Sequence, residues 1–149
     1  MATTFWFSDV TRAAFAGELD LAAGGDTIKA VAVMENCTAP TEEDMQYVAD
    51  LTTLDEFDGS GYARVTVASQ ALTLDAALNQ TKWDGADIVF PALGIGTRKC
   101  IGLLLIKDTG NPATDNLLVF LGVTPFDPVG LTVTWLLDTE GIGLIQAVT

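Results

Sequence analysis

The sequence predicts a mainly β protein, an antiparallel β-sandwich or barrel-like fold of about seven to eight strands. Short apolar runs recur along the 149 residues at fairly regular spacing, and turn residues separate them. No long helical pattern lies between these runs, so parallel sheets built from strand–helix–strand units are not expected. No internal repeat or linker interrupts the pattern, and we therefore expect a single β-rich domain covering residues 1–149.

The chain opens with three consecutive aromatic residues, Phe5, Trp6 and Phe7. In an extended segment, neighbouring side chains point to opposite faces. Either both faces of this segment are covered, or residues 1–7 form an extended arm that packs on a neighbouring subunit. Because aromatic residues dominate binding hot spots, these three are our candidate protein-interface residues, and we expect a chain without residues 1–7 to fold but to assemble less well.

A short helix is expected directly after the aromatic segment. Val10, Ala14 and Phe15 stand at helical spacing, Ser8 or Asp9 can cap the start, and Gly17 can end the helix. Residues 26–34 follow as a strand that is apolar on both faces, which is typical of a central position in a sheet. Farther on, Thr41 and Asp44 resemble a capping box, so a second short helix is expected near residues 41–49.

The acidic, turn-rich residues 50–61 predict an exposed loop, and most of the strands follow it. Pro91 favours the end of a strand or an edge strand. Gly94-Ile95-Gly96 resembles part of a dinucleotide fingerprint, but the next segment is also a strand, so a connecting turn is expected there. The strands are expected in residues 62–67, 72–74, 86–93, 98–107, 117–123, 131–135 and 142–148.

Composition limits the classes of partner. The net charge of −13, with seven scattered basic residues, argues against nucleic acid and against an anionic membrane surface. Charged residues make up only 18% of the chain and apolar residues 49%, whereas about 25% charged is usual. A domain this small has too little polar surface to cover itself. We therefore expect an apolar patch that is buried against further copies or another protein.

The residues that most enzymes use are missing. The chain has no histidine, which excludes Ser–His–Asp and Cys–His arrangements, and its two cysteines, Cys37 and Cys100, are expected to be buried thiols. Asp55, Glu56 and Asp58 could act as paired carboxylates only if burial kept one of them protonated, which a hydrophilic loop does not do. We expect no enzymatic activity and no cofactor, with a calcium ion at these three carboxylates as the weaker alternative to a solvated acidic loop.

Several segments along the chain form a set of short motifs in a fixed order. They are Phe5 with Phe15-Ala-Gly17-Glu18-Leu19-Asp20-Leu21, Asp26-Thr27-Ile28-Lys29-Ala30-Val31-Ala32-Val33, Gly61-Tyr62, Trp83 with Ala86-Asp87-Ile88-Val89-Phe90, Gly102 to Gly110, Leu117 to Leu121, Thr132-Val133-Thr134-Trp135 and Gly141-Ile142. In their order and spacing these segments resemble a family of small virion structural proteins of tailed phages. The resemblance runs nearly end to end and is loosest between residues 34 and 60.

The resemblance implies a β-rich subunit of the virion, assembled in the host cytoplasm. A capsid decoration (cement) protein, expected as a homotrimer that binds the major capsid protein and stabilises the outer surface of the head shell, is the first hypothesis. A tail or head–tail connector component is an alternative of similar composition. A carbohydrate-binding module for host attachment is a third, and it would need Trp83 or Trp135 exposed for stacking on a sugar.

Overall fold

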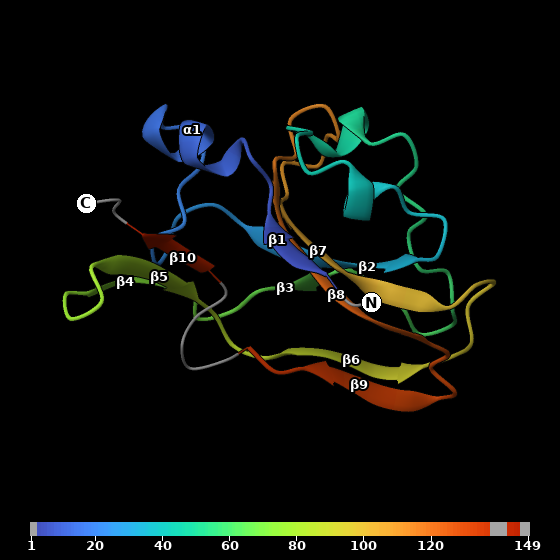
Figure 1. The fold of residues 1–149 in the computed structure, drawn as a ribbon. Coiled ribbons are helices and arrows are strands. Elements are labelled where there is room, and N and C mark those ends of the chain that lie inside the picture. Colours follow the sequence, from blue (N-terminus) through green and yellow to red (C-terminus); the bar gives the residue numbers. More distant parts are fainter. Residues whose placement is uncertain (1–2, 138–142, 147–149) are drawn as a thin grey trace.

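The computed structural model describes residues 3–137 and 143–146, and it confirms a mainly β fold (Figure 1). Its centre is a five-stranded sheet, and every strand pairing in it is antiparallel. The order across this sheet is β1 (Thr4–Trp6), β8 (Leu117–Phe126), β7 (Cys100–Lys107), β2 (Ile28–Met34) and β3 (Val65–Thr66).

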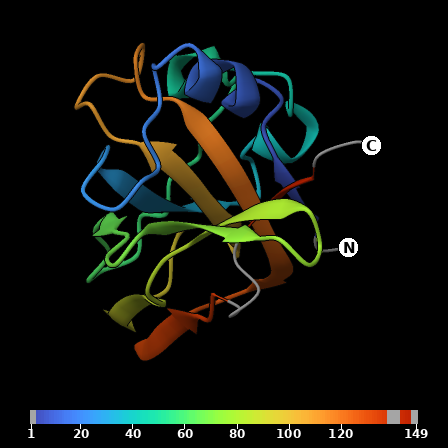
Figure 2. The ribbon, with the colours of Figure 1, turned by 90° about the vertical axis from the view of Figure 1, so that its left-hand side faces the viewer.

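Two smaller antiparallel sheets accompany the central one. The first has the order β10 (Gly143–Gln146), β5 (Gln80–Asp84) and β4 (Ala71–Asp75). The second is a two-stranded ribbon of β6 (Ile88–Leu93) and β9 (Leu131–Trp135). Figures 1 and 2 show the ribbon beneath the central sheet, with the helical segments on the opposite side. The arrangement is sandwich-like and forms no closed barrel.

The central strands are buried because both faces of the sheet are covered. Side chains of β2, β7 and β8 supply about half of the buried apolar residues, as their apolar runs predict. On the ribbon side, the ring of Phe90 stacks on Tyr62 at 5.8 Å and meets Trp135 edge-on at 5.8 Å. The predicted central strand at residues 26–34 is confirmed, since β2 lies between β7 and β3.

The predicted first helix is confirmed as α1 (Val10–Phe15), and Gly17 follows it with a φ of 73°. The prediction of a second short helix near residues 41–49 is wrong. Two short 3-10 turns, Ala39–Thr41 and Val48–Asp50, stand at the ends of this range instead. The hydroxyl of Thr41 donates back to the carbonyl of Thr38, so it does not cap a helix that starts after it.

The strand β5, which we did not predict, has the polar sequence Gln80-Thr-Lys-Trp-Asp84. Its neighbours β4 and β10 pair with it on both sides, and backbone hydrogen bonding therefore decides its conformation. The expected strand at residues 142–148 corresponds to β10, although residues 142 and 147–149 lie outside the described part of the chain.

Candidate interaction surfaces

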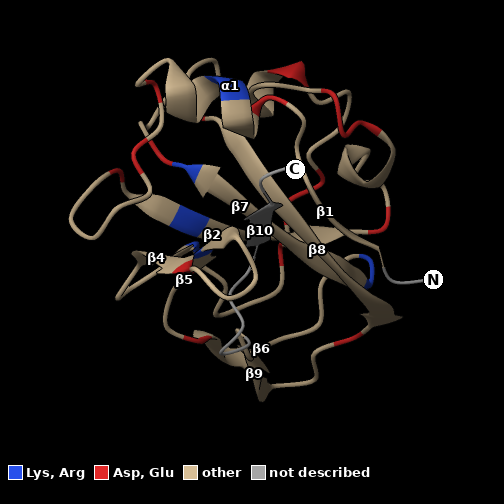
Figure 3. Cartoon of the chain, turned by 60° about the vertical axis from the view of Figure 1, so that its left-hand side comes forward, with Lys and Arg blue, Asp and Glu red and all other residues tan. Residues whose placement is uncertain are grey.

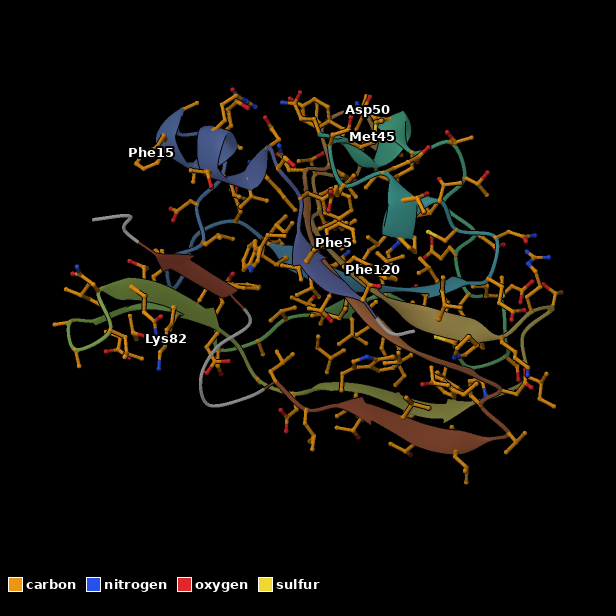
Figure 4. All side chains as sticks on the ribbon, viewed as in Figure 1. Phe5, Phe15, Met45, Asp50, Lys82 and Phe120 are labelled. Atoms are coloured by element: carbon orange, nitrogen blue, oxygen red, sulfur yellow. The ribbon has the colours of Figure 1, made fainter. Side chains whose placement is uncertain are left out.

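The three aromatic residues at the N-terminus belong to the fold of their own chain. They form and follow β1, which pairs with β8 at one edge of the central sheet. The Phe5 ring lies 5.2 Å from Phe7 and 5.7 Å from Phe120, and Figure 4 shows Phe5 and Phe120 side by side. Trp6 meets Trp83 edge-on at 6.1 Å. Both faces of the segment therefore contact other parts of the protomer.

This placement corrects the extended arm expected for residues 1–7, as far as residues 3–7 are described. Phe7 is only 2% exposed and has almost no surface left for a partner. Phe5 and Trp6 are partly exposed, and their interface role stays a prediction. Because Phe7 is a core residue, we no longer expect the chain without residues 1–7 to fold normally.

An apolar hollow of about 200 Å³ opens beside this edge of the sheet. Gly122 lines this hollow, and a Cβ atom at position 122 would collide with the carbonyl oxygen of Thr3. Glycine thus lets the N-terminal segment approach β8 closely. The hollow is lined by Thr3, Pro40, Ile101, Phe120, Gly122, Val123 and Pro125.

The three carboxylates considered for calcium point to three different partners. Asp55 accepts a hydrogen bond from Arg98 Nε at 3.0 Å, and Asp58 accepts one from the hydroxyl of Thr97 at 2.7 Å. Glu56 accepts hydrogen bonds from Arg64 and Tyr62, described below. Within residues 3–137 and 143–146, no group of three His, Cys, Asp or Glu side chains is arranged to hold a metal ion.

The segment that carries these carboxylates is tied to the core more firmly than an exposed loop. Phe57 is buried, and its ring meets Tyr62 edge-on at 5.7 Å. Glu56 Oε2 accepts a hydrogen bond from Arg64 at 2.7 Å, and Glu56 Oε1 accepts one from the Tyr62 hydroxyl at 2.8 Å. That hydroxyl in turn accepts a bond from the backbone N–H of Ala32 in β2.

Charges and burial set the protonation of this segment. The hydrogen bond from Arg98 lowers the pKa of Asp55, and those from Thr97 lower the pKa of Asp58. Burial alone would raise the pKa of Glu56, but the hydrogen bonds from Arg64 and Tyr62 outweigh it and hold that pKa below its ordinary value. All three groups are therefore ionised near pH 7, and none serves as a general acid there.

The remaining candidate residues are mostly structural. Cys37 and Cys100 are free and buried as expected, and burial raises the pKa of Cys37 to about 11, which leaves it an unreactive thiol. Trp83 is buried and cannot stack on a sugar, and Trp135 is half-buried against Phe90 and Phe126.

The predicted connecting turn at residues 94–96 is confirmed, since these residues join β6 to β7. The composition of the chain predicted an apolar surface but not its location. Charged residues are spread over the loops, α1 and strands such as β2 and β5, whereas the ribbon is largely without them (Figure 3). Residues 88–97 and 129–137 contain no charged residue at all, and this gap in the charge pattern is a signal that the sequence itself carries.

Two groups of exposed apolar side chains define the candidate surfaces. The hairpin surface is formed by Leu72, Leu74 and Leu78 on and between β4 and β5. The ribbon surface is formed by exposed apolar side chains on and beside β6 and β9. Its members are Val89, Ile95, Val129, Leu131 and Leu136.

Comparison with known proteins adds no relative. No protein-family model matches the chain, and neither a curated protein nor a solved structure matches it. None of the helices in the described part of the chain is long and apolar enough to cross a membrane.

Proposed function

We propose that the chain is a structural protein of a phage particle, most directly a decoration protein that binds the major capsid protein on the outside of the head shell. The observation that carries the proposal is the pair of exposed apolar surfaces on a small chain of net charge −13. Large apolar side chains that stay exposed on a small domain mark sites of protein contact. The segments that resemble virion proteins supply the class of partner.

The hairpin surface is the part we assign to the shell. Leu74 is 77% exposed, and Leu72 lies two residues away on the same face of β4. Burying such side chains stabilises a contact by roughly 25 cal/mol per Å² of apolar area. One hairpin gives a modest affinity, but a homotrimer would present three of them at once, and linked contacts bind far more tightly than single ones.

The test compares two substitutions in the same strand. Leu74→Asp places a charge on the hairpin surface, whereas Thr73→Asp adds the same charge to an exposed residue on the other face of β4. We expect Leu74→Asp to weaken binding to heads that lack this protein at least tenfold, and Thr73→Asp to leave it nearly unchanged. Co-sedimentation with purified heads measures both. Equal binding by the two variants would contradict the assignment of the hairpin surface.

The number of copies per particle tests the proposal itself. A protein that covers the shell is present in hundreds of copies, whereas a ring in the tail or neck has roughly six to twelve. Quantitative mass spectrometry of purified particles gives this number. A count in the lower range would assign the protein to the tail or the head–tail connector. Its absence from the particle would contradict the proposal that it is a virion structural protein.

A further inference from the structure

Among the described strands, β9 has an outer edge with no partner. β9 pairs with β6 on one side, and no other described strand pairs with it. Figure 1 shows β9 at the lower border of the molecule, with no described element beyond it. An open strand edge presents unpaired N–H and C=O groups and is a template for a further strand.

Proteins usually protect such an edge with charges, proline or a bulge. The neighbouring strand β6 has Pro91 and an irregular register between Phe90 and Leu93. By contrast, β9 is Leu-Thr-Val-Thr-Trp and has none of these devices. Of the two edges of the ribbon, the outer edge of β9 is thus the one without protection.

We infer that β9 pairs with β9 of a second copy, antiparallel and about a two-fold axis, so that two ribbons form one continuous four-stranded sheet. The inference deepens the proposed structural function by naming a contact between copies, and only its biological use rests on that function. It is separate from the expected threefold contact, and neither contact requires the other.

Charge favours a second copy over another kind of partner. A chain of net charge −13 repels its own copies over most of its surface, so self-contact needs a region free of charge. β9 lies in such a region, since residues 129–137 contain no charged residue. A basic partner would instead gain most from the acidic loops, and it has no electrostatic reason to choose this strand.

Symmetry fixes the register of the pairing. A two-fold axis perpendicular to the sheet keeps each residue on its own face, so only residues of the same face can stand opposite each other. The register that pairs all five residues is centred on Val133. It sets Thr132 opposite the partner's Thr134, and Leu131 opposite the partner's Trp135.

This register covers a residue that the monomer leaves exposed. Leu131 is on the same face of β9 as the half-buried Val133 and Trp135, yet it is 63% exposed. The partner's Trp135 would cover it, and burying the apolar surface of the two side chains is stabilising. The two Thr–Thr pairs lie on the opposite face, where directly facing threonines are also favourable.

Charge substitutions at positions 132 and 134 test both the contact and its register. The pair Thr132→Glu with Thr134→Glu sets like charges opposite each other twice. The pair Thr132→Glu with Thr134→Lys sets opposite charges together twice and leaves the net charge unchanged. Thr66→Glu with Thr73→Glu is the matched control, because it adds the same two charges on exposed residues of other strands.

Sedimentation equilibrium over a range of protein concentrations measures dimer formation, and circular dichroism checks that each variant folds. We expect the wild type to form a dimer at high concentration, and the Glu–Glu variant to dimerise at least tenfold more weakly than the control. The Glu–Lys variant should dimerise at least as well as the wild type. A wild type that stays monomeric, or a Glu–Glu variant that dimerises like its control, would overturn the inference.

Disulfide trapping gives a second readout that tolerates weak affinity. Paired residues in an antiparallel sheet have Cα atoms about 4.5–5.5 Å apart, within disulfide range. Thr132→Cys combined with Thr134→Cys should therefore form a covalent dimer on oxidation, whereas either substitution alone should not. Efficient trapping by a single substitution would disprove the register. Binding to heads is measured separately, so a dimer without head binding, or head binding without a dimer, shows which proposal has failed.

Discussion

At the scale of single residues, the fold assigns opposite roles to side chains of the same type. Phe7 is 2% exposed in the core, whereas Phe15, eight residues later, is 87% exposed at the end of α1. Both were apolar residues in predicted elements, and local spacing treated them alike. Which of the two is buried depends on where β1 and α1 meet the central sheet.

These two phenylalanines make a matched pair for measuring stability. Phe7→Ala should lower the free energy of unfolding by about 3–5 kcal/mol, because it removes a large buried ring and leaves a cavity. Phe15→Ala should change it by no more than about 0.5 kcal/mol. Urea denaturation of both variants gives the comparison. Similar losses in the two variants would mean that the N-terminal segment does not pack as described.

At the scale of elements, the Glu56 network joins residues 56–64 to the central sheet. Glu56 bridges Val33 through the backbone and holds Arg64 and Tyr62 through its carboxylate. The side chain of Glu56 is 27% exposed, so the pair with Arg64 is partly shielded from water. These contacts hold the acidic segment against the central sheet.

The network makes stability depend on pH. The pKa of Glu56 is lower in the folded state than its ordinary value, so its contribution is present above the unfolded pKa of about 4.3 and is lost as the pH falls through the folded pKa. Glu56→Gln should therefore cost about 1–2 kcal/mol at neutral pH, and this difference from the wild type should shrink toward pH 3.

Chemical denaturation at several pH values measures this difference. Asp44→Asn is the control, because it neutralises an exposed carboxylate. We expect that control to differ from the wild type by no more than about 0.5 kcal/mol at neutral pH. A cost of Glu56→Gln that stays constant from pH 7 to pH 3 would contradict the assigned role of the charge.

At the scale of the whole molecule, an acidic protein with uncharged surfaces has two opposing tendencies. Net charge keeps its copies apart, while the ribbon and hairpin surfaces favour contact. Added salt screens the charge repulsion between copies and leaves the apolar contacts in place. The distance over which charges act falls from ~30 Å at about 0.01 M salt to ~3 Å at about 1 M.

Self-association should therefore strengthen as sodium chloride is raised over this range. We expect at least a threefold lower dissociation constant at the high-salt end, measured by sedimentation equilibrium at pH 7. A contact built on ion pairs would show the opposite trend, since salt weakens it. Association that weakens with salt would therefore locate the contact away from the uncharged strands.

Prediction from the sequence succeeded where a pattern is local. The apolar runs of β2, β7 and β8 indicated buried strands because strands covered on both faces need apolar residues throughout. It failed for β5, whose polar residues follow no such pattern, and for the second helix, where Thr38 and Thr41 bond within a 3-10 turn. Phe5 and Trp6 do lie on a strand, but local spacing could not show that Phe120 and Trp83, which are far away in the sequence, pack against them.

The sequence by itself determined the β class, the excess of acid and the lack of histidine chemistry, since these follow from composition and from spacing along the chain. Only the tertiary structure decided which apolar residues remain at the surface. That choice depends on contacts between segments distant in the sequence, which cover Phe7 and Trp83 but leave Leu74 and Leu131 exposed. The order of strands likewise left β9 at an edge, and an edge exists only once the sheets have formed.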